Sequence, residues 1–181
     1  MPAVPRAFSL GFTLVECLVG LGVLAVLVGA AAPRLDDLIQ ARRLVALSGL
    51  LEADLQHARA LAVARHATLR FEITPPEAGG PACYLLHTGR KGDCRCGHEG
   101  ATTCQPGAAL LRSAALGPEL RVSLRASAPS FVFEPVIGAV TPATTIEFTD
   151  AGGRGMRLVV NAMGRVRRCA QGVSLQGWPP C

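Results

Sequence analysis

The sequence predicts an α+β fold, in which one long N-terminal helix is followed by a domain of mostly antiparallel strands. Residues 12–32 form an apolar run that contains a single charged residue, Glu16. Apolar residues then recur at spacings of three and four as far as Ala62, which is the period of an amphipathic helix. From Ala67 the pattern changes to short runs separated by turns that contain Gly and Pro, and such runs indicate strands.

The apolar run is long enough to cross a membrane. At about 1.5 Å rise per residue, a helix over residues 12–32 matches a bilayer core of about 30 Å. We therefore expect a membrane-spanning helix over residues 12–35, which continues past Pro33 into a water-exposed, amphipathic half over residues 36–66. A carboxylate inside a membrane is costly and needs a partner. For Glu16 the nearest unusual cation is a free amine at Phe12, if the chain is cut after Gly11.

The order of the N-terminal features differs from that of a secretory signal. In a secretory signal the small residue at the cleavage site follows the apolar run, whereas here Gly11 precedes it. Cleavage after Gly11 would therefore leave the apolar helix on the mature protein. We expect residues 1–11, with Arg6 as their one positive charge, to be a short leader that is removed. The alternative is an uncleaved single-pass anchor.

Residues 67–181 are expected to form the strand domain. The segment 68–73 alternates between apolar and polar residues, as a half-buried strand does. Candidate strands share such short apolar runs between turns and lie at residues 68–73, 83–87, 120–125, 131–134, 145–148 and 156–160. Together they predict a mostly antiparallel sheet packed on the second half of the helix, with a Gly- and Cys-rich loop between Thr88 and Pro106.

The composition favours a binding or structural role over catalysis. The formal charge is +5, and no acidic residue follows Asp150, which favours an acidic partner without naming one. No nucleophile elbow, zinc-protease helix, phosphate-binding loop or dinucleotide motif is present in the sequence. The scattered histidines are expected to be surface or sheet-face residues, so we expect no enzymatic activity and no cofactor.

Cysteine usage indicates an oxidising compartment. Cys17 lies in the apolar run, and six cysteines remain for the exported part of the chain, which is typical of disulfides. They are Cys83, Cys94, Cys96, Cys104, Cys169 and Cys181. The sequence allows 15 connectivities. The pairing favoured by closeness in the sequence joins Cys169 to Cys181. The other four cysteines would then form two further bridges. A zinc site at Cys94, Cys96, His98 and Cys104 is the alternative, but it lacks the paired spacing of zinc sites.

One segment near the C-terminus carries a binding signal. If the backbone is extended, Arg165 and Arg167 point to the same side about 6.5 Å apart, and Val166 turns inward. Gly164 permits close approach of a ligand, and Arg168 adds charge. Arginine forks fit phosphate oxygens, which makes nucleic acid the natural polyanion. The alternative is a solvated strand edge whose charge prevents aggregation.

The N-terminus resembles a known processing site. The sequence Gly11-Phe12-Thr13-Leu14-Val15-Glu16 is similar to that of type IV prepilins and type II secretion pseudopilins. The resemblance implies that a prepilin peptidase cuts after Gly11 and methylates Phe12. It also implies that Glu16 pairs with the Phe12 amine of a neighbouring subunit in a filament.

Further segments extend the resemblance over nearly the whole mature chain. Residues 55–62, 131–138, 159–161 and 164–169 resemble the FimT/GspH family of minor pilins and pseudopilins, which implies a pilin-like fold. In the FimT-like members a Gly-Arg-x-Arg tail binds DNA during natural transformation, and Gly164, Arg165 and Arg167 match it. The H-type pseudopilins of type II secretion share the fold without that role.

The resemblance therefore implies two alternative functions. The first is a minor type IV pilin in the bacterial inner membrane and at a pilus tip, with a periplasmic C-terminal domain, other pilins as partners, and DNA bound without sequence preference. If about three phosphates are neutralised, the logarithm of affinity falls with that of salt at a slope near −2.7. The second is a structural subunit that contacts only protein. The sequence leaves open the choice between pilus and secretion system, the strandedness of the DNA, the place in the filament and the role of the Cys94–Cys104 loop.

Overall fold

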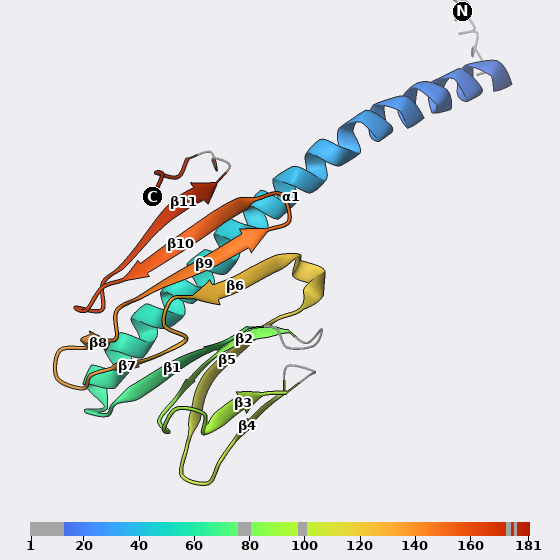
Figure 1. Cartoon of the computed structure of the whole chain (residues 1–181). Coiled ribbons are helices and arrows are strands. Elements are labelled where there is room, and N and C mark those ends of the chain that lie inside the picture. The colour runs from blue at the N-terminus through green and yellow to red at the C-terminus, as the bar shows by residue number, and fades with distance from the viewer. Residues whose placement is uncertain (1–12, 76–80, 98–100, 173–174, 176) are drawn as a thin grey trace, which may run out of the picture. The chain divides into compact units, whose positions relative to one another are not determined.

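The computed structural model describes residues 13–75, 81–97, 101–172, 175 and 177–181 (Figure 1). Within it the chain divides into two compact units, the first ending at Ile39 and the second running from Gln40 to Cys181. The helix α1 (Leu14–Ala64) is continuous through both, so its predicted continuation past Pro33 is confirmed.

The first unit consists of the apolar half of α1. Its described side chains from Thr13 to Ile39 are all exposed in the isolated chain, including Leu14 at 75% and Val26 at 72%. This part of α1 is long and apolar enough to cross a membrane. A bilayer or neighbouring subunits would remove this apolar surface from water.

In the second unit, one face of α1 packs on strands. The fully buried residues recur at the helical spacing and are Leu44, Leu51, Leu55, Ala58 and Ala62. They join a core of sheet residues that includes stacked aromatic rings, with Phe71 5.3 Å from both Tyr84 and Phe131 between ring centroids. The amphipathic pattern of residues 36–66 therefore produces the expected helix-on-sheet packing, although α1 ends two residues earlier, at Ala64.

The strands form two larger antiparallel sheets and a two-stranded ribbon. The first sheet has the order β5 (Leu110–Leu116), β2 (Ala82–His87), β1 (Leu69–Thr74), β7 (Ser130–Phe133) and β8 (Val140–Thr141). The second has the order β11 (Val166–Gly172), β10 (Arg154–Val160), β9 (Thr144–Asp150) and β6 (Val122–Ala126). The ribbon pairs β3 (Cys94–Cys96) with β4 (Thr102–Cys104), and the short 3-10 helix η1 (Pro118–Leu120) precedes β6. The antiparallel prediction is confirmed, with two larger sheets where one was expected.

The first sheet departs from the predicted half-burial. Tyr84 and Leu86 of β2 belong to the core with α1, whereas Leu85 and His87 on the opposite face are also fully buried. Glu72 of β1 is in register with Leu85 and is buried too. The prediction of a half-buried strand at residues 68–73 is therefore wrong for Glu72. The alternating pattern could not reveal that the Cys-rich segment covers this face, where Cys83 of β2 is bonded to Cys96 of β3.

Candidate nucleic-acid interface

The arginine-rich segment forms the turn and second strand of a hairpin. Strands β10 and β11 are antiparallel, and Val160 is in register with Val166. In the turn, Asn161 accepts hydrogen bonds from the Gly164 amide on its backbone oxygen and from the Arg165 amide on its side-chain oxygen, both at 2.9 Å. Arg165 therefore lies at the end of the turn, and its backbone is fixed by Asn161.

Gly164 has a steric reason to be glycine. Its φ is +72°, a backbone conformation that disfavours other residues. An added Cβ would overlap the carbonyl oxygen of Gly138 and lie 2.9 Å from Cδ of Arg59. Arg59 of α1 holds the Gly138 loop by donating from Nε to that carbonyl oxygen at 3.2 Å. The hairpin turn, the 134–139 loop and α1 thus meet at Gly164.

Arg165 and Arg167 are exposed, and Val166 between them is half-buried. The alternation agrees with the predicted extended backbone from Val166 onward, where β11 begins. Within the described part of the chain, neither guanidinium has a carboxylate partner. Arg165 lines a pocket with Arg59 and Ala60 of α1, whereas Arg167 lines a groove with Arg157 and Val159 of β10. Exposed guanidinium groups without a carboxylate partner can bind the oxygens of phosphates.

Arg168 lies on the other face of β11. It is in register with Leu158, a core residue of β10, and its Nε donates to Oε2 of Glu52 on α1 at 2.5 Å. Its guanidinium carbon also lies 4.6 Å from the centre of the Trp178 ring, a cation–π contact. The structure therefore does not bring Arg168 together with Arg165 and Arg167, and its charge is already neutralised.

The C-terminal tail, residues 177–181, is attached to β11. The expected Cys169–Cys181 disulfide is present. The Ala170 amide donates to the carbonyl oxygen of Pro179 at 2.8 Å, and the Cys181 amide donates to that of Ala170 at 3.0 Å. The disulfide and these hydrogen bonds hold the tail beside the strand that carries Arg167.

The other four cysteines of the strand domain form the two bridges expected among them. They are Cys83–Cys96 and Cys94–Cys104, while Cys17 is free and exposed. Because Cys94, Cys96 and Cys104 are oxidised, none can supply a thiolate to zinc. His98, the fourth ligand of the alternative zinc site, lies outside the described residues.

Glu16 caps the start of α1. Thr13 donates from its amide to Oε2 of Glu16 at 3.0 Å, and the Glu16 amide donates to the Thr13 hydroxyl at 3.2 Å. This reciprocal pair is a capping box, which gives the carboxylate a local partner. The processing residues Gly11 and Phe12 lie outside the described residues.

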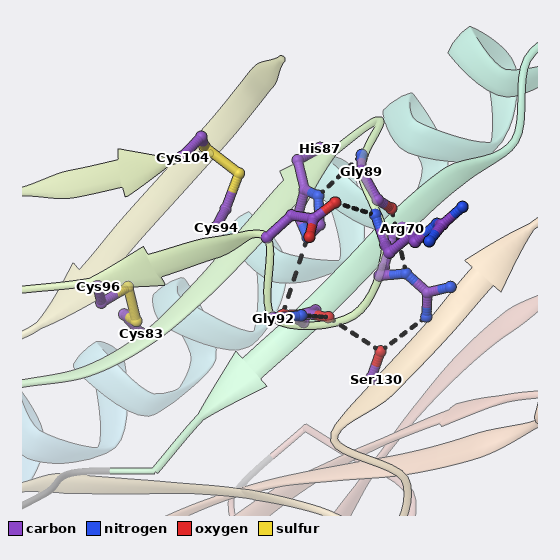
Figure 2. Close-up of polar contacts among 12 residues, drawn as sticks. Arg70, Cys83, His87, Gly89, Gly92, Cys94, Cys96, Cys104 and Ser130 are labelled. Atoms are coloured by element: carbon purple, nitrogen blue, oxygen red, sulfur yellow. Dashed lines mark hydrogen bonds and ion pairs between the residues drawn. A yellow bond between two sulfur atoms is a disulfide. The ribbon is translucent and has the colours of Figure 1, made fainter. Parts of the chain in front are cut away.

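A buried polar cluster on the first sheet was missed by sequence reasoning. Figure 2 shows His87, Gly89 and Gly92 close to Arg70 and Ser130. Nδ1 of His87 accepts from the Gly89 amide at 3.1 Å, and Oε1 of Glu72 accepts from the Gly92 amide at 3.0 Å. These bonds fasten the loop between β2 and β3 over Glu72 and His87. Arg70 and His87 are cross-strand neighbours, a register that the sequence alone does not give.

His87 is a sheet-face residue, as expected, but that face is covered and its side chain is fully buried. Burial lowers the pKa of His87, and Arg70 adds to this effect, whereas Glu72 and Asp93 act in the opposite direction. Nε2 of His87 lies 3.8 Å from Oε2 of Glu72. The hydrogen bond from the Gly89 amide holds the loop between β2 and β3, and burial favours the neutral form of the His87 imidazole.

Comparisons with known proteins follow the same two parts of the chain. Residues 48–164 match the family model described as type II transport protein GspH. Residues 6–32 match the model of the prokaryotic N-terminal methylation motif. No curated protein gives a significant sequence match.

Solved structures similar to this chain include two crystal forms of the type IV minor pilin FimU from Pseudomonas aeruginosa. They are 18% and 17% identical with TM-scores of 0.47 and 0.49, and the matches cover 69% and 76% of this chain and 91% and 93% of FimU. The minor pseudopilin EpsH from the type 2 secretion system of Vibrio cholerae is 12% identical with a TM-score of 0.45, and the match covers 71% of this chain and 97% of EpsH.

Proposed function

Since the chain belongs to the GspH family of minor pilins and pseudopilins, we propose that it binds DNA without sequence preference through Gly164, Arg165 and Arg167. The expected pilin-like α+β fold is confirmed, and the family is one of structural subunits, not enzymes. The observation that carries the proposal is that Arg165 and Arg167 are exposed and without a carboxylate partner within the described residues, while Asn161 holds the Arg165 amide and Arg167 pairs with Val159 of β10.

The chemistry of the site favours the phosphate backbone as the ligand. Arginine presents a planar fork that matches phosphate oxygens, and phosphate contacts position a protein on DNA without reading its bases. Tyr84 and Trp178 are the only Tyr and Trp in the sequence. Tyr84 is buried and Trp178 stacks on Arg168, so neither is placed to stack on bases.

Arg168 has a different role in this proposal from the one that its charge alone suggested. Because it pairs with Glu52 and stacks on Trp178, we assign it to positioning β11 and the tail. With Arg165 and Arg167 as the only two phosphate contacts, the logarithm of affinity should fall with that of salt at a slope near −1.8. Two contacts alone would lower the affinity for duplex DNA about 12-fold between about 50 and 200 mM salt.

The N-terminal region fits assembly into a filament. We propose that a prepilin peptidase removes residues 1–11, that residues 12–35 anchor the subunit in the inner membrane, and that residues 36–66 and 67–181 lie in the periplasm. The match to the methylation motif supports processing at Phe12. On assembly with other pilins, the Phe12 amine of a neighbouring subunit would replace Thr13 as the partner of Glu16.

The second candidate function is a structural pseudopilin subunit without DNA binding. It is favoured by the description of the matching family, which names a type II transport protein. In that role the exposed arginines would keep a strand edge soluble.

Binding of duplex DNA to the full processed chain in zwitterionic nanodiscs tests the proposal. We expect an Arg165→Gln/Arg167→Gln variant to lose most of its affinity. An Arg90→Gln/Arg95→Gln variant is the matched control, because it removes the same charge from two exposed arginines of the Cys-rich segment. If both double variants lose the same affinity for DNA, the loss reflects the lower net charge and not the position of Arg165 and Arg167. Absence of binding by the unaltered chain would favour the structural role.

A mass measurement of the protein after co-expression with a prepilin peptidase tests the processing step. We expect a chain that begins with methylated Phe12. A chain that still begins with Met1 would refute processing, and with it the proposed filament contact of Glu16.

A further inference from the structure

The outer face of the second sheet continues the surface of Arg167. Strands β11, β10, β9 and β6 lie side by side (Figure 1). In the register, Arg167 faces Val159, and Arg157 faces both Cys169 on β11 and Glu147 on β9. Opposed residues and residues two apart share one face of a sheet, so Arg157 and Arg167 project from the same side. Leu158 and Arg168 project from the other side.

A groove lies between this face and the fastened tail. It has a volume of about 430 Å³, and its lining includes Arg157, Val159, Arg167, Pro179 and Pro180. Val159 is 37% exposed, so the floor of the groove is open to solvent. Arginines stand on both strands that form the floor, and Pro179 and Pro180 form part of its wall. The lining also includes Arg168, whose charge is paired with Glu52. A groove with Arg157 and Arg167 as its other cations and prolines in its lining is complementary to an extended chain of negative charge.

One carboxylate restrains the second cation. Arg157 donates from Nε to Oε1 of Glu147 at 2.9 Å, and its Nη2 lies 2.7 Å from the same oxygen. Both side chains are about one-third exposed, at 32% and 35%. Exposed ion pairs of this kind are weak, so a phosphate that enters the groove can take the place of Glu147. Arg125 of β6 is the cross-strand neighbour of Glu147 on its other side.

We propose that the groove between β10–β11 and the C-terminal tail is a further phosphate-binding position, in which Arg157 contacts the DNA backbone and Glu147 competes with it. The inference rests on the proposed function, because it extends the site of Arg165 and Arg167 across the sheet. The DNA strand would run from the hairpin turn along β11 and under the tail. Glu147 then tunes the affinity, since it occupies Arg157 whenever phosphate is absent.

The salt dependence of binding by the unaltered chain measures the number of contacts. With Arg157 as a third contact the slope is near −2.7, and affinity for duplex DNA falls about 40-fold between about 50 and 200 mM salt. Arg157→Gln should return the slope to near −1.8 and the loss to about 12-fold. Arg95→Gln is the matched control, because it removes one exposed arginine from β3 and should leave the slope unchanged.

A substitution that strengthens binding excludes misfolding as the cause. Glu147→Gln frees Arg157, and at low salt it should tighten binding by about two- to fivefold, the range expected from the strength of exposed ion pairs. The gain should disappear in an Arg157→Gln background and persist in an Arg125→Gln background. Glu119→Gln, at an exposed position on η1, should give no such gain.

The outcomes separate this inference from the proposed function. If Arg165→Gln/Arg167→Gln abolishes binding while Arg157→Gln and Glu147→Gln bind as the unaltered chain does, the hairpin site stands and the groove is refuted. If the unaltered chain does not bind DNA, both are refuted. If the gain from Glu147→Gln persists without Arg157, the competition between Glu147 and phosphate for that residue is refuted.

Discussion

Replacing Gly164 by alanine adds one methyl group at the point where the hairpin turn, the 134–139 loop and α1 meet. The added Cβ would overlap the carbonyl oxygen of Gly138 and press on Arg59. Arg59 also donates to the carbonyl oxygen of Ile137 at 3.3 Å. The methyl group would therefore displace the loop that Arg59 holds, and with it the start of the segment that carries Arg165.

A second glycine on the same sheet allows the steric cost to be separated from the backbone cost. Gly153 in the β9–β10 turn has φ +77°, close to the +72° of Gly164, but a Cβ there would meet no atom within 4 Å. Gly153→Ala should therefore cost only the strain of the left-handed conformation, about 1–2 kcal/mol. Gly164→Ala adds overpacking of about 1–3 kcal/mol. Both gain equally from a stiffer unfolded chain, so that term cancels in the comparison.

Urea unfolding of the two variants measures this difference. Trp178 is the only Trp and lies in the second unit, so its fluorescence reports on the unfolding of that unit in the full chain. We expect Gly164→Ala to be less stable than Gly153→Ala by about 2 kcal/mol, or roughly 4–8 °C in Tm. Equal stability of the two variants would refute the close approach at Gly164.

Further predictions concern the second unit. Tyr84→Phe should lower the free energy of unfolding by about 2 kcal/mol, because Tyr84 donates to buried Asp54 at 2.6 Å; a cost below about 0.5 kcal/mol by urea unfolding would contradict this. Burial lowers the pKa of His87, so the unfolded chain protonates first and stability should fall as the pH drops below about 6.5. Between neutral and acidic pH, the midpoint of urea unfolding should change less for His87→Gln than for the unaltered chain. The same pH dependence in both proteins would refute this. Cys169→Ser/Cys181→Ser opens a disulfide across a sequence separation of 12. It should cost about 3 kcal/mol in the same assay and weaken DNA binding, and unchanged affinity would show that the tail is not needed to place Arg167.

The helix and the central strands could be predicted because their side-chain patterns report directly on burial. The runs at residues 131–134, 145–148 and 156–160 correspond to β7, β9 and β10. Strand β5 was missed because Ala114 and Ala115 in its second half resemble a helix as much as a strand, and most of its side chains are exposed at the edge of the sheet. Strands β3 and β4 are three residues each, and two disulfides hold them. No local pattern encodes such a pairing.

The arginine segment shows where sequence reasoning about the site reached its limit. In an extended strand the period that turns Val166 inward turns Arg168 inward as well. Arg168 was expected to add its charge to that of Arg165 and Arg167, but it lies on the opposite face of β11. The partners of Arg168 could not be predicted, because Glu52 lies more than one hundred residues earlier in the chain. The role of Glu147 was hidden for the same reason, since it depends on the register between β9 and β10.

Arg168, on the inner face of β11, helps to fix the strand next to Arg165 and Arg167. Arg168 pairs with α1 through Glu52 and stacks on the tail through Trp178, and Cys169 is bonded to Cys181 next to it. Strand β11 is thus fixed to the helix and to the tail within two consecutive residues. Ordering a flexible arginine segment on binding would cost free energy for each immobilised side chain, and here the backbone part of that cost is met when the domain folds. If Arg165 and Arg167 contact phosphate as proposed, less free energy is spent on ordering their backbone than a mobile segment of the same composition would need.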